Sequence, residues 1–297
     1  MEKIAIITYN ILSPNLAKLM INDDVYTTDI MEDKYRLYKI EKYLKHQIEK
    51  YIKYNLIICL QEVPEDWLII FSQLFTSLKY KYINVQYGRV DNGNMGVLIA
   101  YPDYLNINKS EFFNVGQFIE INDDISRKAS SKNNIAIFAI FENKNSNLKF
   151  GVITYHMPCV PSIPQIALLH SKTIYRHIKK FMNNINWIFA GDFNMTPDTM
   201  AYNYLVNTIN LGCIWKDVLR HYPITNHAYI SNFEFSGCID YMFYNKGKIN
   251  IKDTPIKYIG SNLICNKVKL NKLVNIIPDK YEPSDHIPIF SLFILLN

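Results

Sequence analysis

The sequence is poor in features that mark several common protein classes. Five cysteines are scattered through 297 residues with no CxxC pair, so neither a zinc ribbon nor a disulfide framework is indicated. The amino terminus, MEKIAIITYNIL, lacks the basic start and the small-residue cleavage site of a signal peptide. The apolar run IPIFSLFILL has about half the length of a membrane-spanning helix. We therefore expect a soluble, intracellular protein of the cytoplasm with no membrane partner.

Internal repeats, low-complexity linkers and a clear domain boundary are also missing. The chain is 49% hydrophobic and 20% charged, which is enough apolar material for a substantial core. We expect a single domain spanning residues 1–297. The net charge of +5 suits a polyanionic partner without demonstrating one.

The spacing of apolar residues predicts both helices and strands along the chain. Apolar residues spaced by three and four predict an amphipathic helix over 33–54, and further helices are expected over 66–78, 164–182 and near 199–208. A hairpin is expected around the turn GRVDNGNMG, and an irregular segment around 252–276. Strands are predicted in the runs KIAIITYNIL, NLIICLQEV, NNIAIFAIFEN, NLKFGVITYHM, WIFAG, GCIDYMFY and SDHIPIFSLFILL.

Some of these strands are apolar throughout and need cover on both faces, whereas others follow one another directly, as in hairpins. Two mixed sheets packed together, with helices outside, accommodate both patterns.

The stretch WIFAGDFNMTP places an acid and an amide two positions apart after a buried strand. In an extended segment Asp192 and Asn194 would face the same side. Both residue types are also ordinary turn formers, so this stretch alone does not identify a site.

Polar residues recur at the ends of the predicted strands. Each alone has an ordinary explanation, such as a turn cap or a core histidine. Together they would be costly to bury unless they meet one another, a metal or a substrate. A shared pocket at one end of the sheets accounts for all of them: Asn10, Glu62, His156, Asp192, Asn194, Asp240, Asp285 and His286.

Taken in order, the motifs TYNIL, LQEV, YHMP, GDFN, IDY and SDHIP resemble the endonuclease/exonuclease/phosphatase superfamily, which has the DNase I-like fold. The resemblance extends from residue 5 to residue 290. It implies a four-layer α/β sandwich, with two packed mixed β-sheets flanked by helices, and a magnesium-dependent phosphoester hydrolase. The segment TNHAYISNFEFSGCIDYMFY is similar, more loosely, to deadenylases, nocturnin-like enzymes and 2′,5′-phosphodiesterases.

The candidate metal ligands carry carboxylate or amide oxygens, which suit Mg²⁺ or Mn²⁺ better than structural zinc. The resemblance implies that Glu62 is the principal ligand. It places Asn10 nearby and leaves Asp285 for a second or shifted metal position.

The other motif positions imply roles at the phosphate. By resemblance, Asp192 orients and deprotonates the attacking water, and Asn194 holds that water or the phosphate. His286 contacts a phosphate oxygen, Asp240 fixes the tautomer of His286 and favours its imidazolium form, and His156 is a further donor.

The resemblance favours single-stranded RNA as the substrate, cleaved by a deadenylase-like 3′ exoribonuclease. Lys172 and Arg176 either contact phosphates or form solvated surface. The alternatives are a small-molecule phosphoesterase acting on an inositol phosphate or a phospholipid head group, a DNA endonuclease, and a non-catalytic binding module. The sequence indicates no obligate protein partner. The leucine-rich repeats of some relatives are missing, and HMPCVPSIPQ follows the histidine strand.

Overall fold

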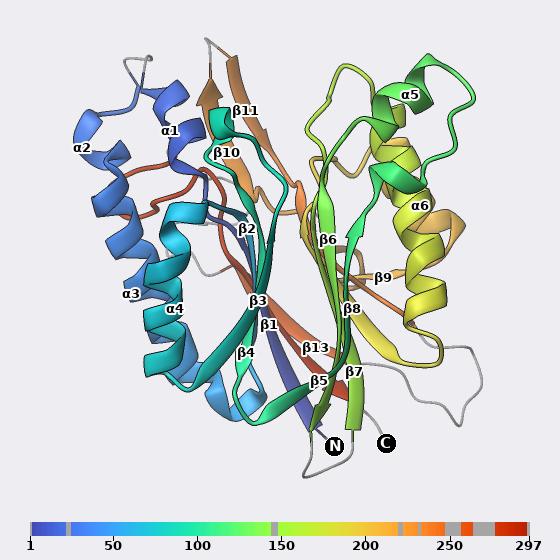
Figure 1. Ribbon diagram of the computed structural model, residues 1–297, viewed down its shortest axis with the longest axis horizontal. Coiled ribbons are helices and arrows are strands. Elements are labelled where there is room, and N and C mark those ends of the chain that lie inside the picture. The colour runs from blue at the N-terminus through green and yellow to red at the C-terminus, as the bar shows by residue number, and fades with distance from the viewer. Residues whose placement is uncertain are drawn as a thin grey trace.

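The computed structural model describes residues 2–21, 25–143, 148–218, 222–230, 233–246, 257–263 and 277–295. Two six-stranded sheets pack face to face, and helices cover the outer face of each (Figure 1). The predicted four-layer α/β sandwich is confirmed.

The first sheet contains both ends of the described chain. Strands β1 and β2 run parallel, and its other neighbouring strands run antiparallel. In spatial order the strands are β13 (Lys257–Leu263), β14 (Ile289–Leu295), β1 (Glu2–Asn10), β2 (Ile57–Val63), β4 (Gly96–Pro102) and β3 (Tyr80–Gln86).

The second sheet has the same plan, with β7 and β8 as its parallel pair. A separate hairpin, β10 (Asn226–Ile230) and β11 (Phe233–Gly237), stands beside the two sheets. In spatial order the strands of the second sheet are β5 (Leu105–Asn114), β6 (Ile135–Asn143), β7 (Leu148–His156), β8 (Asn186–Asp192), β12 (Asp240–Tyr244) and β9 (Gly212–Cys213).

The long helices form the outer layers (Figure 1). Helices α3 (Asp33–Tyr51) and α4 (Leu68–Ser77) cover the first sheet, and α6 (Gln165–Phe181) covers the second, with α5 (Asp124–Ser130) packed against it. The helices predicted over 33–54, 66–78 and 164–182 are confirmed. The remaining helical elements are α1 (Pro14–Met20), α2 (Thr28–Met31), η1 (Ile52–Tyr54), η2 (Glu65–Trp67), η3 (Val90–Asn92), η4 (Gly116–Phe118), α7 (Met200–Asn203), the π-turn η5 (Tyr204–Thr208) and α8 (Ile214–Val218).

Side-chain alternation along β1 divides the core into layers. Ala5 and Ile7 point outward and pack with the apolar face of α3, whereas Ile4 and Ile6 point into the core between the two sheets. The described helices include none that is both long enough and apolar enough to cross a membrane.

Towards the carboxyl end of β1 the space between the sheets becomes polar. Thr8 continues the inward series, and its hydroxyl donates to Gln61 Oε1 at 3.2 Å. Gln61 Nε2 in turn donates across to Thr154 Oγ1 of the second sheet at 3.0 Å. The next inward residue is Asn10, so alternation places this side chain between the two sheets.

Two strands are shorter than the apolar runs that predicted them. The run GCIDYMFY was expected to place Asp240 within a strand, but β12 begins at Asp240, because Gly237 ends the hairpin strand β11. The final strand begins at Ile289, so Asp285 and His286 lie in the irregular segment before it.

The prediction of an irregular segment around 252–276 is wrong for residues 257–263. These residues form β13 and pair with β14. The rest of that segment lies outside the described residues.

Candidate active site

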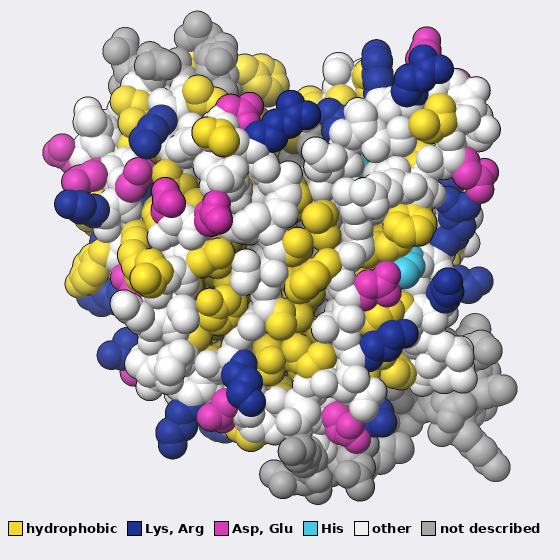
Figure 2. Space-filling model, viewed as in Figure 1, with side chains coloured by type: hydrophobic (Ala, Val, Ile, Leu, Met, Phe, Trp, Pro, Cys, Tyr) yellow, Lys and Arg dark blue, Asp and Glu magenta, His cyan; other side chains and the backbone are white. Residues whose placement is uncertain are grey.

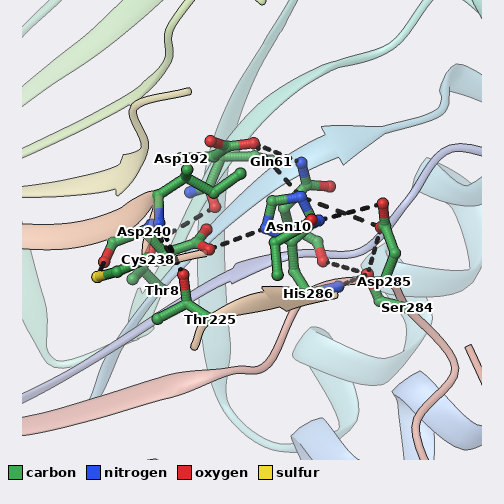
Figure 3. A network of polar contacts seen from close by, with 12 residues as sticks. Thr8, Asn10, Gln61, Asp192, Thr225, Cys238, Asp240, Ser284, Asp285 and His286 are labelled. Atoms are coloured by element: carbon green, nitrogen blue, oxygen red, sulfur yellow. Dashed lines mark hydrogen bonds and ion pairs between the residues drawn. The ribbon is translucent and has the colours of Figure 1, made fainter. Parts of the chain in front are cut away.

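The carboxyl ends of the two parallel strand pairs meet in the gap between the sheets. Asn10 ends β1 and Glu62 lies near the end of β2, while His156 and Asp192 end β7 and β8 and are direct partners in the register. Asp240 is the register partner of Asp192 on its other side. The structure thus brings predicted residues from both sheets into one cluster, and Figure 3 shows Asn10, Asp192, Asp240, Asp285 and His286 within it.

Glu62 reaches this cluster through a β-bulge. Ile58 and Leu60 pack beneath the helices, so regular alternation would send Glu62 outward as well. The register with β4 shifts between Gln61 and Val63, and Glu62 adopts a φ of 58°. Left-handed backbone at a non-glycine residue costs about 1–3 kcal/mol and clusters at functional sites. The bulge therefore redirects the carboxylate towards the gap between the sheets.

Asn10 connects acids from the two sheets. Its Nδ2 donates to Glu62 Oε1 and to Asp192 Oδ2, both at 3.0 Å, and its Oδ1 accepts the backbone N–H of Leu12 at 3.0 Å. The Ser13 N–H donates to Glu62 Oε2 at 2.8 Å. The amide nitrogen of Asn10 faces the carboxylates here. Metal ligation by Asn10 would need its amide oxygen in that place, so this role stays a prediction.

Asn194 does not lie in the extended backbone that the sequence led us to expect. It has a φ of 46°, and its N–H donates to Asp192 Oδ1 at 2.9 Å. Asparagine tolerates this conformation, and an aspartate side chain readily accepts from the residue two positions on. The Asn194 side chain donates to Met157 O at 2.9 Å. Asn194 still lines the cleft described below. A turn, and not strand alternation, sets the direction of its side chain.

Asp240 and His286 form a buried pair, although they are distant in the sequence. Asp240 Oδ2 lies 2.9 Å from His286 Nδ1, so the predicted contact is confirmed. Burial raises the pKa of Asp240 to about 6, against the attraction of His286. Burial lowers the pKa of His286, but Asp240, Asp192 and Asp285 outweigh it and hold that pKa well above its ordinary value. These shifts favour a carboxylate paired with an imidazolium.

His156 approaches the same acids from the second sheet. Its Nε2 lies 3.5 Å from Asp192 Oδ2 and 3.8 Å from Glu62 Oε1. Its Nδ1 lies 2.7 Å from the hydroxyl of Tyr87. His286 Nε2 is also 3.5 Å from Asp192 Oδ2, so the two imidazoles flank one carboxylate.

Asp285 is held at the edge of the cluster. Asn226 Nδ2 donates to its Oδ2 at 3.2 Å, and His286 Nε2 lies 4.0 Å from its Oδ1. Burial raises the pKa of Asp285. Arg36 is fully buried behind this region, where its guanidinium donates to the carbonyls of Ile11, Leu12 and Pro283. It therefore ties the chain after β1 to the segment that carries Asp285 and His286.

Part of the cluster lines a cleft of about 1090 Å³: Glu62, His156, Asp192, Asn194, Asp285 and His286. The outline of the molecule is notched at the top of Figure 2, at the end where Figure 1 shows the hairpin of β10 and β11. Lysine or arginine side chains lie beside the notch. One part of the lining is apolar, with Leu16 and Leu19 of α1 and Phe233 and Phe235 of β11. Another part contributes Arg89, Lys132, Asn133 and Asn134.

Lys172 and Arg176 lie elsewhere. Both are exposed on α6, outside the cleft lining, where Lys172 lies over Tyr204 and Arg176 faces Glu120 at 3.9 Å. Their surface role is the better supported of the two interpretations.

Sequence reasoning missed several residues that hold the site. Arg36 lies in the helix predicted over 33–54, where the spacing of apolar residues does not mark it, and Asn226 lies in a segment noted only for its similarity. Tyr87 directly precedes the turn GRVDNGNMG, which was the one available signal. Thr225 accepts the N–H groups of Ile239 and Asp240 at 3.0 and 3.1 Å, and it begins the same similar segment TNHAYISNFEFSGCIDYMFY.

The cluster fits a divalent cation by its charge and donor types. Glu62, Asp192, Asp240 and Asp285 are four buried carboxyl groups, and burying several anions together is costly without a compensating cation. Each oxygen of Glu62 accepts one hydrogen bond, so lone pairs remain for a ligand. Within the described part of the chain, ligand atoms of Asp192, Asp240 and His286 all lie within 4.8 Å of one another. Oxygen donors of this kind favour Mg²⁺ or Mn²⁺.

Known proteins resemble the chain in both sequence and structure. The Ccr4 subunit of the CCR4-Not complex from Mycosarcoma maydis, a 3′-5′-exoribonuclease, is 24% identical over 216 residues, which cover 58% of this chain and 31% of that protein. The chain thus spans about a third of that relative's length. Among solved structures, the 2′,3′-cyclic phosphatase ANGEL2 with adenosine-2′,3′-vanadate has a TM-score of 0.77 at 16% identity, covering 98% of this chain and 95% of ANGEL2. The human nocturnin catalytic domain with bound sulfate has a TM-score of 0.70 at 18% identity, covering 100% and 96%.

The structural matches establish the fold. The sequence matches the model of the Endonuclease/Exonuclease/phosphatase family over residues 7–286, a range that includes every residue of the cluster. The chain therefore belongs to the Endonuclease/Exonuclease/phosphatase family.

Proposed function

We propose that this protein is a divalent-metal-dependent phosphodiesterase that removes nucleotides from the 3′ end of single-stranded RNA, as deadenylases do. The observation that carries the proposal is the convergence of Asp192, Glu62, His156 and the Asp240–His286 pair at the floor of an open cleft. Because both sheets supply this cluster, we further propose that the chain acts as one catalytic domain.

In this proposal Asp192 orients the attacking water and takes its proton. Its carboxylate is fixed from two sides, by the Asn194 N–H on Oδ1 and by Asn10 Nδ2 on Oδ2. The His286 imidazolium and the His156 Nε2–H donate to the phosphate oxygens, where negative charge gathers as the bond breaks. The hydrogen bonds that fix Asp192 and His286 reduce the reorganisation needed for reaction.

Glu62 and Asp285 would hold the cation, with Asn10 beside them. A bound Mg²⁺ or Mn²⁺ supplies positive charge that offsets the charge of the phosphate and helps to orient it. The structure provides oxygen donors for either ion and does not favour one over the other.

The walls of the cleft support a single-stranded substrate. Phe233 is 67% exposed, and the half-buried Phe235 lines the cleft two residues further along the same strand, so the two rings offer a surface for stacking against bases. Arg89 and Lys132 offer cations for backbone phosphates. The Ccr4 relative is named as a 3′-5′-exoribonuclease, which favours cleavage from the 3′ end.

One product analysis tests the reaction and the substrate together. The protein is incubated with labelled poly(A), mixed-sequence RNA, single-stranded DNA, duplex DNA, 2′,5′-linked oligoadenylate and an inositol phosphate, with excess chelator and with added Mg²⁺ or Mn²⁺. We expect stepwise shortening of the single-stranded RNAs from the 3′ end, no hydrolysis in chelator, and recovery on adding either ion. Glu62→Gln keeps the side-chain volume and should raise the Mg²⁺ concentration needed for half-maximal rate.

Two outcomes of this experiment contradict parts of the proposal separately. Full activity in excess chelator would refute the metal assignment. Faster cleavage of duplex DNA or of the inositol phosphate than of any RNA would refute the substrate and leave the fold unaffected. Asp192→Asn is the inactive control, because it retains shape and loses the base.

A further inference from the structure

Among the described residues, Tyr87 is the one whose side chain forms a hydrogen bond with Nδ1 of His156. It follows the last residue of β3, in the first sheet, whereas His156 ends β7 in the second. The hydroxyl lies 2.7 Å from His156 Nδ1, and the two rings meet edge to face with centroids 6.2 Å apart. Tyr87 therefore holds the imidazole across the gap between the two sheets.

The backbone around Tyr87 is fixed. The N–H groups of Tyr87 and Gly88 both donate to Met95 O, at 3.1 and 2.8 Å, and Gln86 Nε2 donates to Val63 O at 3.1 Å. A hydroxyl carried on such a frame can select one ring orientation of its partner.

The surroundings of His156 determine where its proton lies. Nε2 faces Asp192 Oδ2 at 3.5 Å and Glu62 Oε1 at 3.8 Å. A bare nitrogen there would repel both carboxylates, so Nε2 carries a proton. In the neutral imidazole Nδ1 is then an acceptor, and the hydroxyl of Tyr87 is the donor that satisfies it. Burial raises the pKa of Tyr87 well above its ordinary value, so the phenol keeps its proton.

We propose that Tyr87 is a positioning residue for catalysis, whose hydroxyl binds Nδ1 of His156 and thereby holds the protonated Nε2 towards Asp192, Glu62 and the substrate phosphate. The inference rests on the proposed function for the identity of that phosphate. The contact itself and the tautomer it selects do not depend on which phosphoester is cleaved.

A tyrosine with a merely structural role provides the matched control. Tyr80 begins the same strand, is buried, and donates its hydroxyl to the backbone carbonyl of Leu56 at 3.0 Å. Tyr87→Phe and Tyr80→Phe each remove one hydroxyl and keep the ring. A general loss of stability would affect both variants, whereas a positioning effect belongs to Tyr87 alone.

The first readout is the tautomer of His156, observed in long-range ¹⁵N–¹H spectra of protein labelled at histidine. His156→Gln assigns the ring signals among the seven histidines of the chain. We expect the wild-type spectrum to show a protonated Nε2 and an accepting Nδ1. Tyr87→Phe should shift the Nδ1 signal and mix the two tautomers, and Tyr80→Phe should leave the spectrum unchanged.

The second readout is steady-state hydrolysis of RNA. Losing one hydrogen bond that orients a donor corresponds to about a tenfold fall in kcat, and KM should change less than twofold. Tyr80→Phe should alter neither constant. An unchanged His156 tautomer in Tyr87→Phe, or an equal fall in kcat for both variants, would overturn the proposal.

The two readouts separate this inference from the proposed function. If no tested phosphoester is hydrolysed, the proposed function fails, yet the spectra still decide the role of Tyr87. If Tyr87→Phe does not fold, the wild-type spectrum alone is decisive, because a bare Nε2 with a protonated Nδ1 would exclude the assigned contact.

Discussion

The two histidines that flank Asp192 are held by partners of different chemistry. His286 binds a carboxylate, Asp240, and His156 binds a phenol, Tyr87. Both pairs join the two sheets. Asp240 and His156 belong to the second sheet, whereas Tyr87 follows β3 and His286 precedes β14 in the first.

The partners differ in charge, and this difference assigns the two imidazoles different tasks. The Asp240 carboxylate raises the pKa of His286, and in the proposed function the resulting imidazolium is a positive charge for a phosphate oxygen. The phenol of Tyr87 adds no negative charge, because burial raises its pKa. In the proposed mechanism the Asp240–His286 pair supplies charge, and the Tyr87–His156 pair orients a donor.

The largest expected effect comes from breaking the charged pair. Asp240→Asn keeps the shape but removes the negative charge that stabilises the imidazolium, so kcat should fall about 10²-fold or more, by analogy with loss of an orienting carboxylate elsewhere. His286→Ala should cost at least as much, while KM changes little. Single-turnover rates on labelled RNA measure both losses.

A double-mutant cycle tests whether Asp240 and His286 act as a unit. The double variant should be scarcely slower than the worse single variant, because residues that act together are not additive. Strictly multiplicative losses would show that the two residues act independently, despite their 2.9 Å contact.

The contact between Asp240 and His286 was one of the features that the sequence predicted. An acid beside an apolar strand needs a partner, and the motif order supplied one. The apolar runs likewise predicted β1, β2, β6 and β7, and the single buried face of each long helix fixed its period.

Features that depend on pairing between distant strands were not predicted. Regular alternation would send Glu62 beneath the helices, and the bulge that redirects it exists only in the register with β4. Nothing in the local sequence of Tyr87 shows that the end of β3 meets β7 across the gap. The left-handed turn at Asn194 is equally invisible, since aspartate and asparagine suit both a turn and an extended end.

A smaller effect on kcat/KM is expected from pH, and it should depend on the Asp240–His286 pair only. The pKa of Asp240 is raised to about 6, so this carboxyl gains a proton as the pH falls through 6 and ceases to support the imidazolium. Wild-type kcat/KM should therefore decline below pH about 6, by up to tenfold per unit. Asp240→Asn cannot titrate and should lose that limb. Tyr87→Phe should retain it, and a limb that persists in Asp240→Asn would assign the titration to another group.

The smallest effects on kcat should come from Thr225 and Asn134, which hold the backbone of Asp240 and of His156. Thr225 Oγ1 accepts the N–H groups of Ile239 and Asp240 deep in the fold, and Asn134 Nδ2 donates to His156 O at 2.9 Å in a half-buried position. Thr225→Val leaves two buried N–H groups unsatisfied, which should cost about 1–3 kcal/mol of stability and lower kcat about fivefold. Asn134→Ala leaves a carbonyl that water can reach, so kcat should fall only about twofold.

Urea unfolding and kcat measured on the same preparations test this ranking. Thr173→Val, at a buried threonine of α6 away from the cleft, controls for the loss of a hydroxyl in the core and should leave kcat unchanged. If Asn134→Ala slows the reaction more than Thr225→Val, then His156 depends on its backbone position more than on the ring contact to Tyr87. The division of the site into one pair for charge and one for direction would then need revision on the side of His156, while the Asp240–His286 cycle would stand independently.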